Sequence, residues 1–542
     1  MRITMDSVTG LLSPDFRTRF MGTRPVKLFK IVMHGMPAVL ALSSRSWLVY
    51  NYQGRLHVTP LSYETLEYGS GFSSDQCPEG LVCVAANTLR ILTIQRLGEV
   101  FNQQAIKLAF TPRKMVLLND SKCFVLIETD HNVDAAAAQA AGSSALDNAN
   151  QEDDEEETSV PYQIFGVQRA GLGKWASCIR VLDPIEGDTK QVIDMWEDEA
   201  AVSVCLVKFH DRPGDQFVLV GTTTGMKLGD RSAEGCIHTY SVSGTQLTLL
   251  HKTTIDAVPR ALCAFQGRVL VGAGKTMRLY DFGRRKLLRK CENRRFPCMI
   301  VSIQTQGERI FVGDVAESFF YAKYNRSTNS LFIFGDDTNA RWLTAACCLD
   351  FDTLAGGDKF GNVFVCRLPA EAKDDAGEEP GAIGGYDHGN AEGARFKVNE
   401  IVQFHVGETV TSIQKCSLSP GGAEAIVYGT VGGGIGAMQP FVSRQDVDFF
   451  MHLEMHLRGA SGAREVRDSK DEGGGYDHPS VCGRDQLSFR SSYFPVKDVI
   501  DGDLCETFLA LDKKRQKTIA DDLDRTPGEI AKKLEDMRNR LL

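Results

Sequence analysis

A chain of 542 residues is longer than one hydrophobic core usually supports, so two or three domains are expected. The net charge of -9 and the hydrophobic content of 43% are typical of a globular protein and argue against general binding to phosphate backbones. The 15 cysteines form no CxxC pair, which disfavours a zinc site or a compact disulfide framework and indicates reduced thiols inside the cell.

The N-terminal sequence has no apolar core of the kind that signal peptides contain, and no run of 18 apolar residues occurs along the chain. Neither secretion nor a membrane-spanning segment is therefore expected. From about Arg45 to Pro440, short apolar runs rich in β-branched and aromatic residues alternate with Gly, Asn and Asp turn signals. This pattern predicts an all-β fold.

The β-rich region contains a repeat. An apolar strand, a glycine-containing turn and a second strand recur, for example in RVLVGAGKTMRLYDF from Arg268 and RIFVGDVAESFFYAKY from Arg309. Gly272 and Gly313 are 41 positions apart, and Gly313 and Gly356 are 43 apart. A period of about 40 to 50 residues is typical of four-stranded propeller blades.

Two polar insertions interrupt the repeat. The next repeated glycine, Gly429, follows Gly356 by 73 positions, and a Gly-rich, acidic segment near 369–395 accounts for the excess. A second insertion near 131–160 is rich in alanine and ends in a run of six carboxylates, Glu152 to Glu157. Segments of this composition bury little apolar surface, so both insertions are expected to be disordered surface loops.

After Pro440 the pattern changes from strand to helix. Ser443 and Asp446 resemble a capping box ahead of the segment VDFFMHLEMHLR. At the C-terminus, Thr526 is a plausible N-cap, with Pro527 in the first turn and Glu529 completing the box. An apolar stripe then follows at helical spacing, made of Ile530, Leu534, Met537 and Leu541.

Three motifs partly match catalytic or metal-binding patterns but have simpler interpretations. GAGKT at Gly272–Thr276 ends like a phosphate-binding loop, yet Val269 stands where the first glycine is required, so a β-turn is expected. His452 and His456 have the spacing of two zinc ligands, but Leu453 replaces the glutamate of a metalloprotease, which favours an ordinary helix face. GYDH occurs at Gly385–His388 and Gly475–His478, and loop composition is the better explanation for both copies.

The strongest basic patch is GRRKLLRK, from Gly283 to Lys290. It either binds RNA phosphates or an acidic partner, or is simply a charged turn with exposed strand ends. Its cations are Arg284, Arg285, Lys286, Arg289 and Lys290.

Catalysis has no positive support, since no GxSxG elbow or other catalytic motif occurs, and no enzyme activity is expected. Loops at the rims of a propeller that mix aromatic and charged residues make good protein-binding anchors. The best such loops are Gly335–Trp342, Gly356–Asn362 and Val406–Val410. The alternative for Trp342 is that its ring packs between blades.

Several sequence blocks carry a family resemblance. They include PLSYETLEY from Pro60, FSSDQCPEG from Phe72, FFMHLEMHLR from Phe449, CGRDQLSFRSSYFPVKDVIDGDLCETF from Cys482 and LDRTPGEIAKKLEDMR from Leu523. These blocks closely resemble the large β-propeller subunits, subunit 3, of splicing factor 3b, and the resemblance covers nearly the whole chain. That family is similar in fold to the large subunit of damaged-DNA-binding protein and to the largest subunit of the cleavage and polyadenylation specificity factor.

The resemblance implies a mainly β fold, with WD40-like β-propellers of four-stranded blades and a small α-helical C-terminal domain. The chain would correspond to the C-terminal half of such a subunit. Residues 1–108 would be the C-terminal blades of an upstream, incomplete propeller. Residues 109–445 would form the next propeller, and 446–542 the helical domain.

By the same resemblance the chain is a nuclear, non-catalytic scaffold of the U2 small nuclear ribonucleoprotein that acts in pre-mRNA splicing and branch-site engagement. Its partners would be the HEAT-repeat subunit and the small subunits of splicing factor 3b, with contact to pre-mRNA only indirect. No cofactor, metal, membrane or small-molecule substrate is expected. The interface residues implied are Arg341, Trp342, Asp358, Lys359, Thr409 and, more weakly, Lys497.

Two other functions remain open at this stage. The shared fold permits an adaptor in ubiquitin ligation or DNA-damage recognition. It also permits direct RNA binding, as in a subunit of the 3′-end processing machinery, through the patch from Arg284 to Arg295.

Overall fold

The computed structural model forms two compact units, Met1–Ile106 and Lys107–Leu542. It describes residues 21–52, 55–61, 65–75, 77–94, 105–131, 170, 173–184, 187–196, 198–227, 233–372, 394–418, 423–465 and 496–541. Nearly all of the two insertions expected near 131–160 and 369–395 lies outside these residues, as do both GYDH repeats.

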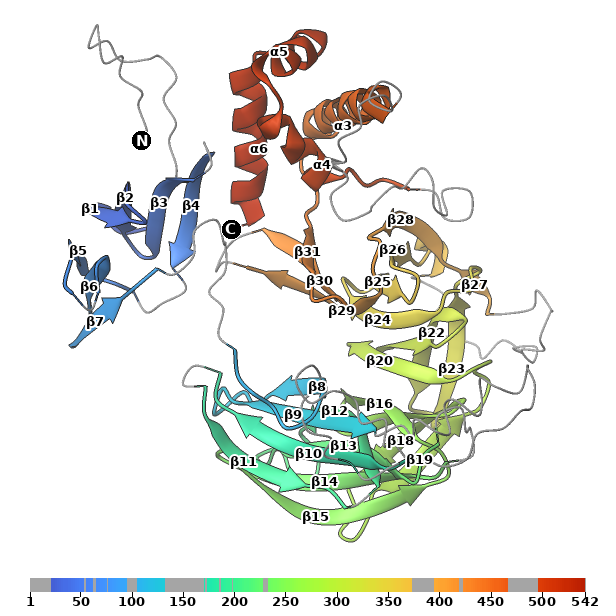
Figure 1. Cartoon of the computed structure of the whole chain (residues 1–542). Helices are drawn as coiled ribbons and strands as arrows, with labels where there is room; N and C mark the ends of the chain where they lie inside the picture. The colour runs from blue at the N-terminus through green and yellow to red at the C-terminus, as the bar shows by residue number, and fades with distance from the viewer. Residues whose placement is uncertain are drawn as a thin grey trace, which may run out of the picture. The chain divides into compact units, whose positions relative to one another are not determined.

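The described part of the first unit contains two antiparallel sheets (Figure 1). One has four strands in sequence order, β1 (Lys27–Met33), β2 (Met36–Leu42), β3 (Ser46–Tyr52) and β4 (Arg55–Leu61). The other has three, β5 (Tyr68–Phe72), β6 (Gly80–Ala85) and β7 (Thr88–Leu92). Leu40 of the first sheet and Leu81 and Cys83 of the second belong to one buried core, so the two sheets pack as neighbouring blades.

In the described part of the second unit, six sheets follow one another along the chain. The first sheet consists of β8 (Pro112–Leu117), β9 (Phe124–His131), β10 (Trp175–Leu182) and β11 (Thr189–Asp194). The second consists of β12 (Glu199–Val207), β13 (Phe217–Thr224), β14 (Gly235–Ser243) and β15 (Gln246–Ile255). The third consists of β16 (Pro259–Phe265), β17 (Arg268–Ala273), β18 (Thr276–Asp281) and β19 (Leu288–Asn293). The fourth consists of β20 (Ile300–Gln306), β21 (Arg309–Asp314), β22 (Ser318–Asn325) and β23 (Ser330–Asp336), with the short β27 (Phe396–Lys397) at its edge. The fifth consists of β24 (Leu343–Cys348), β25 (Thr353–Asp358), β26 (Asn362–Arg367) and β28 (Asn399–His405). The sixth consists of β29 (Val410–Ser417), β30 (Glu424–Thr430) and β31 (Ile435–Met438).

The sheets are arranged as propeller blades, because the first strand of each packs against the first strand of the next, from β8 through β12, β16, β20 and β24 to β29 (Figure 1). Within a blade the central strands are sandwiched between neighbouring blades. The β17 sequence RVLVGA is therefore almost entirely buried, whereas the first three residues of the outer strand β19, LRKCEN, are exposed. This architecture confirms the predicted fold class.

The glycine repeat has a packing reason. A Cβ atom added to Gly272 would lie 2.5 Å from Cγ2 of Ile300, the first residue of the next blade. A Cβ on Gly313 would lie 2.4 Å from Cδ2 of Leu343, which begins the blade after that. In these two blades the second strand thus approaches the following blade too closely for any side chain, and glycine is required there.

The GAGKT motif is a hairpin turn between β17 and β18. Gly274 has a φ of +57°, a left-handed conformation that glycine adopts without strain. The β-turn interpretation is confirmed, and the backbone does not open a helix as a phosphate-binding loop would.

The C-terminal helices are α3 (Arg444–Glu465), α4 (Gly502–Glu506), α5 (Lys513–Asp522) and α6 (Pro527–Leu541), with a 3-10 turn at Thr507–Ala510. The predicted capping box of α6 is present: Thr526 N donates to Glu529 Oε2 at 2.8 Å, and Glu529 N donates to Thr526 Oγ1 at 3.3 Å. Ile530 and Leu534 are buried in one core with Leu453 of α3, as their spacing predicted. No described helix is both long enough and apolar enough to cross a membrane.

A buried contact between a glutamate and a histidine in the second blade of the second unit makes stability depend on pH. His238 Nε2 lies 3.0 Å from Glu199 Oε1, and both side chains are buried. Burial favours the protonated acid, but hydrogen bonds from His238 and Thr222 outweigh it and lower the pKa of Glu199 to about 2. The stability that this shift provides is present above the ordinary value of 4.5 and is lost as the pH falls toward about 2.

We therefore expect Glu199→Gln to flatten the loss of unfolding free energy between about pH 4.5 and 2, measured by urea unfolding at a series of pH values. The substitution of an exposed glutamate beside the same sheet, Glu234→Gln, is the control and should leave the acid slope as in the unsubstituted chain. An acid slope for Glu199→Gln equal to that of the control would contradict the assignment.

Candidate protein interface

Three loops that the sequence singled out meet at one end of the blades. Lys359 N donates to the carbonyl oxygen of Trp342 at 3.0 Å, which joins the β25–β26 turn to the β23–β24 connection. Thr409 Oγ1 donates to the carbonyl oxygen of Lys359 at 2.8 Å, and Val431 N donates to the carbonyl oxygen of Thr409 at 2.9 Å. We refer to Trp342, Lys359, Phe360, Thr409 and Val431 as the rim patch.

The rim patch presents an aromatic ring held by a cation. Trp342 is 45% exposed, so its ring is not enclosed between blades. The ammonium group of Lys359 lies 3.5 Å from the centre of the Trp342 ring and 5.0 Å from that of Phe360. At an exposed site such cation–π contacts stabilise by about 0.5–1 kcal/mol each. The contact orders Trp342 before any partner arrives, which reduces the entropy lost on binding.

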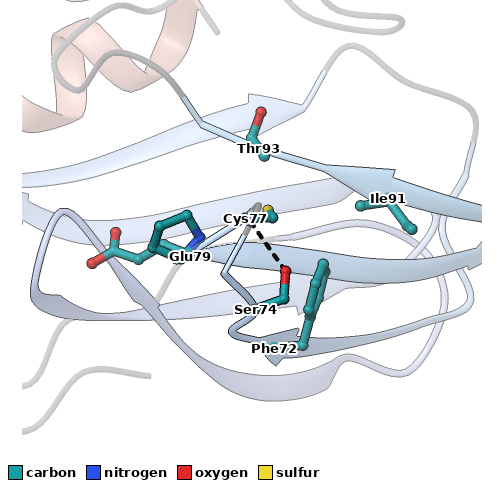
Figure 2. A pocket seen from close by; sticks show the side chains of 7 residues that line it. Phe72, Ser74, Cys77, Glu79, Ile91 and Thr93 are labelled. Carbon is teal, nitrogen blue, oxygen red and sulfur yellow. Dashed lines mark hydrogen bonds between the residues drawn. The ribbon is translucent and has the colours of Figure 1, made fainter.

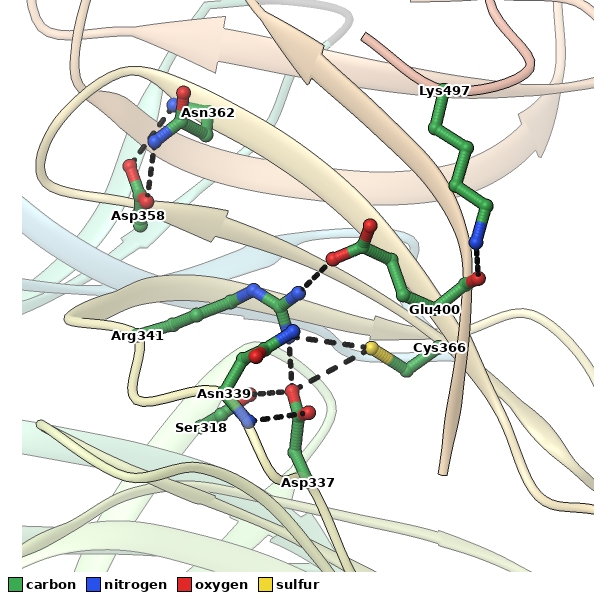
Figure 3. Close-up of polar contacts among 9 residues, drawn as sticks. All are labelled: Ser318, Asp337, Asn339, Arg341, Asp358, Asn362, Cys366, Glu400 and Lys497. Atoms are coloured by element: carbon green, nitrogen blue, oxygen red, sulfur yellow. Dashed lines mark hydrogen bonds and ion pairs between the residues drawn. The ribbon is translucent and has the colours of Figure 1, made fainter. Parts of the chain in front are cut away.

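Asp358 shapes the turn that carries Lys359 and Phe360. Its Oδ1 accepts hydrogen bonds from the backbone nitrogens of Phe360 at 2.8 Å and Asn362 at 2.9 Å, and its Oδ2 accepts from Asn362 Nδ2 at 2.7 Å (Figure 3). The carboxylate is therefore buried and committed to the turn. The structure gives Asp358 a supporting position beneath the surface.

Arg341 also lies beneath the surface, with 2% of the residue exposed. Its guanidinium forms ion pairs with Asp337 and Glu400, lies 4.1 Å from the centre of the Phe364 ring and donates to Cys366 Sγ at 3.6 Å (Figure 3). Burying an ion pair costs desolvation, which is offset only when both partners are well paired. Arg341 thus fixes the loop that presents Trp342, and its predicted direct contact with a partner would require that loop to open.

Asp337 is the centre of this buried network. Its Oδ2 also accepts from Ser318 Oγ at 2.7 Å, and its Oδ1 accepts from the backbone nitrogen of Asn339 at 3.0 Å (Figure 3). Burial, together with the nearby Asp337 carboxylate, raises the pKa of the Cys366 thiol well above its ordinary value. The thiol is therefore neutral and inert.

Lys497 connects the blades to the C-terminal helices. Its backbone pairs with that of Gln403 in β28, with N–O distances of 2.9 and 3.2 Å, and its ammonium group donates to the carbonyl oxygen of Glu400 (Figure 3). Glu400 thus joins Lys497 through its backbone and Arg341 through its side chain. The structure brings Lys497 to the same network as Arg341, although not to the rim patch.

The basic patch lies in the turn between the third and fourth strands of its blade, whereas the rim patch includes a turn between the second and third strands of another blade. In an antiparallel blade these two kinds of turn lie at opposite ends, so the basic patch is at the other end of the blades from the rim patch. Arg284, Arg285 and Lys286 are exposed in the β18–β19 turn. Arg289 pairs with Glu292 at 3.0 Å, and Lys290 lies 3.6 Å from Asp281. The patch and the rim patch are therefore separate features.

Two side chains of the rim patch were missed as individual residues. Phe360 lies inside a loop that the sequence did single out, whereas Val431 lies in the turn before three consecutive glycines. Val431 is 71% exposed, and an exposed valine in a glycine-rich turn is the signal that could have identified it.

A shallow hollow lies on the first unit and is lined in part by the FSSDQC block. Its volume is about 640 Å³, and the residues that line it are Phe72, Ser74, Cys77, Pro78, Glu79, Ile91 and Thr93 (Figure 2). The Glu79 carboxylate accepts from the backbone nitrogens of His34 and Gly35, so it serves the β1–β2 turn. The hollow contains no arrangement of nucleophile and base in the described residues.

Among the described residues, one group of side chains has the proximity of a metal site, His210, Asp211 and Asp281. Asp281 already lies 3.5 Å from Arg268 and 3.6 Å from Lys290, whose positive charges oppose a cation. His452 and His456, which have the spacing of two zinc ligands, are not part of this group. His456 lies 3.8 Å from Asp522.

Comparison with known families decides the classification. The family model of the CPSF A subunit region matches residues 176–510, which is more than half of the chain. The chain belongs to this family. A second model, the RSE1/DDB1/CPSF1 second beta-propeller, matches residues 1–94.

Within this family the chain is similar to named splicing proteins. It is 49% identical to splicing factor 3B subunit 3 of Danio rerio, with 100% of the chain and 44% of that relative covered. It is 49% identical to spliceosome-associated protein 130 A of Arabidopsis thaliana, with 100% and 45% covered, and 40% identical to pre-mRNA-splicing factor RSE1 of Mycosarcoma maydis, with 99% and 43% covered. The chain thus spans less than half the length of these relatives. The resemblance to the splicing branch is confirmed, and these names favour it over an adaptor or 3′-end processing function.

Proposed function

We propose that this chain is a non-catalytic scaffold subunit of splicing factor 3b, acting in pre-mRNA splicing and branch-site engagement as part of the U2 small nuclear ribonucleoprotein. The observation that carries the proposal is the 49% identity, over the whole chain, to a protein named splicing factor 3B subunit 3. A nuclear location follows from the same proposal. Its partners would be the HEAT-repeat subunit and the small subunits of the complex.

The proposed domain organisation follows the resemblance. Residues 1–108 would be the last blades of an upstream propeller, 109–445 a second propeller and 446–542 a helical domain. A boundary near 108 is supported by the division into compact units at residues 106 and 107. Blades stabilise one another by stacking, so the first unit would need further blades for full stability.

The rim patch is the proposed partner-binding surface. A few aromatic anchors usually carry most of the energy of an interface of about 1,600 Å². Trp342 is the proposed anchor, with Lys359 and Thr409 beside it. Arg341, Asp358 and Lys497 would act indirectly, by holding the loops and the adjoining strand in place.

We expect Trp342→Ala to weaken binding of the HEAT-repeat subunit by at least about 2 kcal/mol, roughly thirtyfold in Kd, because a half-exposed ring fills a pocket of the partner. Removing the Lys359 side chain should cost less. Titration calorimetry with the purified partner measures both effects, and circular dichroism establishes that each variant is folded.

The control is Trp196→Ala. Trp196 is 77% exposed and also lies in a connection from an outer strand to the next blade, but it is not part of the rim patch. Equal losses for the two tryptophans would show a general effect of exposed apolar area. Unchanged affinity in Trp342→Ala would remove the rim patch from the interface.

A further inference from the structure

The inner strand of each blade in the second unit contains an extra residue near its start. In all six sheets the pairing of the first strand with the second skips one residue there, which is a β-bulge. First strands line the axis of a propeller, and a bulge re-aims a side chain. The skipped residues are Arg113, Val202, Arg260, Val301, Thr344 and Thr411. Of these six, only the residues of the first and third blades are charged.

The cationic side chains at these two bulges are held in place by neutral groups. The ammonium group of Lys114, the residue after Arg113, donates to the carbonyl oxygen of Arg260 at 3.0 Å, so it reaches from the first blade to the third. The guanidinium of Arg260 contacts Met226 Sδ at 3.7 Å through Nη2. Arg113 Nε donates to the carbonyl oxygen of Thr129 at 3.0 Å. We refer to Arg113, Lys114 and Arg260 as the channel cations.

Most of the hydrogen-bonding capacity of Lys114 and Arg260 is unused. An ammonium group offers three N–H donors and a guanidinium five. Lys114 meets one acceptor among the described residues, and Arg260 Nε is buried with no hydrogen-bond partner in that part of the chain. No described carboxylate acts on the charge of either group. Two neighbouring cations are thus left to be balanced by an external anion.

The same two cations lie in a concavity. Lys114 is exposed to water, yet desolvation lowers the pKa of its ammonium group, and the charge of Arg260 lowers this pKa further. Desolvation also lowers the pKa of Arg260, which is half-buried. A side chain that water reaches while protein surrounds it lies in a hollow and not on an open surface. A charged hydrogen bond is stronger in such a place than on an open surface, because the local dielectric is lower.

The surroundings of the channel cations fit a peptide carboxylate better than a nucleic acid. Val202 is the bulge residue of the blade between them, and Met115, which follows Lys114, is 60% exposed. A nucleic-acid strand has a charge at every nucleotide and needs further cations and stacking rings along its path. The bulges of the other three blades offer only neutral side chains, Val301, Thr344 and Thr411. A few fixed cations with apolar neighbours match one carboxylate on an otherwise apolar peptide segment.

We propose that the channel cations bind an aspartate or glutamate side chain of a partner's peptide segment, which enters the propeller along its axis. The start of a first strand lies at the same end of a blade as the turn between the second and third strands, so this site and the rim patch share one end of the propeller. The inference goes beyond the scaffold function. It concerns a second contact and its chemistry, and it stands whether or not the partner belongs to splicing factor 3b.

The first test measures the Kd of a fluorescein-labelled octapeptide of alternating glutamate and leucine by fluorescence anisotropy with the whole chain. We expect Lys114→Met combined with Arg260→Met to weaken binding at least about tenfold, because charge-assisted hydrogen bonds are lost while methionine keeps much of the volume. A peptide with glutamine in place of glutamate should bind the unsubstituted chain about as weakly. Circular dichroism establishes that the variant is folded.

The matched control is Lys275→Met combined with Arg284→Met. Both residues are exposed, in turns at opposite ends of the third blade, and the change of net charge is the same. Peptide affinity should be retained in this control. Equal losses in the two double variants, or equal binding of the glutamate and glutamine peptides, would overturn the proposal.

The second test locates the contact without any substitution. Limited acetylation with acetic anhydride, followed by mass spectrometry, measures the labelling rate of each lysine with and without the glutamate peptide. We expect the peptide to slow the labelling of Lys114 and to leave that of Lys275 unchanged. An unchanged rate at Lys114 would overturn the proposal. Protection of Lys114 by a uridine homopolymer RNA, but not by the peptide, would also overturn it and assign the site to nucleic acid.

Discussion

Replacing Arg341 with methionine is expected to lower the free energy of unfolding by about 3–5 kcal/mol, because the substitution leaves buried carboxylates without their cation. Asp337 is almost completely buried and Glu400 is partly buried, and both form ion pairs with the guanidinium. Methionine fills much of the same volume, so the loss comes from uncompensated charge and not from a cavity. Urea unfolding followed by circular dichroism measures it.

Arg367→Met is the matched control. Arg367 is an exposed arginine on β26, and its Nε donates to Thr353 Oγ1 at 2.9 Å. A surface substitution of this kind usually changes stability by less than about 0.5 kcal/mol. If Arg341→Met cost no more than Arg367→Met, the buried ion pairs would not be what holds the Trp342 loop.

Replacing Gly361 with alanine is expected to have the second large effect. Gly361 has a φ of +82°, where a side chain adds strain of roughly 1–2 kcal/mol. Its added Cβ would also lie 2.8 Å from the carbonyl oxygen and 2.9 Å from the nitrogen of Glu408. Those are backbone atoms that cannot turn aside, so overpacking adds roughly 1–3 kcal/mol. Thermal unfolding monitors the loss, and the part of the tryptophan fluorescence that is missing in a Trp342→Phe variant reports the displaced turn.

Gly433→Ala separates the two contributions. Gly433 has a similar φ of +86°, but no atom lies within 4 Å of its added Cβ. Its replacement should cost only the conformational strain and leave the environment of Trp342 unchanged. Equal destabilisation by the two alanines would mean that the approach of Glu408 to Gly361 contributes nothing.

Much of the fold could be predicted from local patterns. The spacing of Gly272 and Gly313 indicated the blade period, because both of these blades need a glycine where the next blade approaches. The capping box of Thr526 and Glu529 was also predictable, since it depends on residues three positions apart. Both signals are local, so they can be read without knowing which strands pair.

The candidate site could be predicted only in part. The loops around Trp342 and Lys359 were found because they mix aromatic and charged residues. The burial of Arg341 could not be predicted, because it depends on Glu400, 59 positions away in the sequence. Asp358 was likewise taken for a surface residue, although its carboxylate turns inward to the backbone of the loop. Side-chain direction within a turn depends on tertiary contacts that sequence spacing does not report.

The most direct test of the scaffold proposal is affinity purification of this chain from nuclear extract of its own organism, with quantitative mass spectrometry of the proteins recovered. We expect enrichment of the HEAT-repeat and small subunits of splicing factor 3b, reduced by Trp342→Ala and retained by Trp196→Ala. Recovery of a cullin in place of splicing subunits, or of chaperones alone, would contradict it.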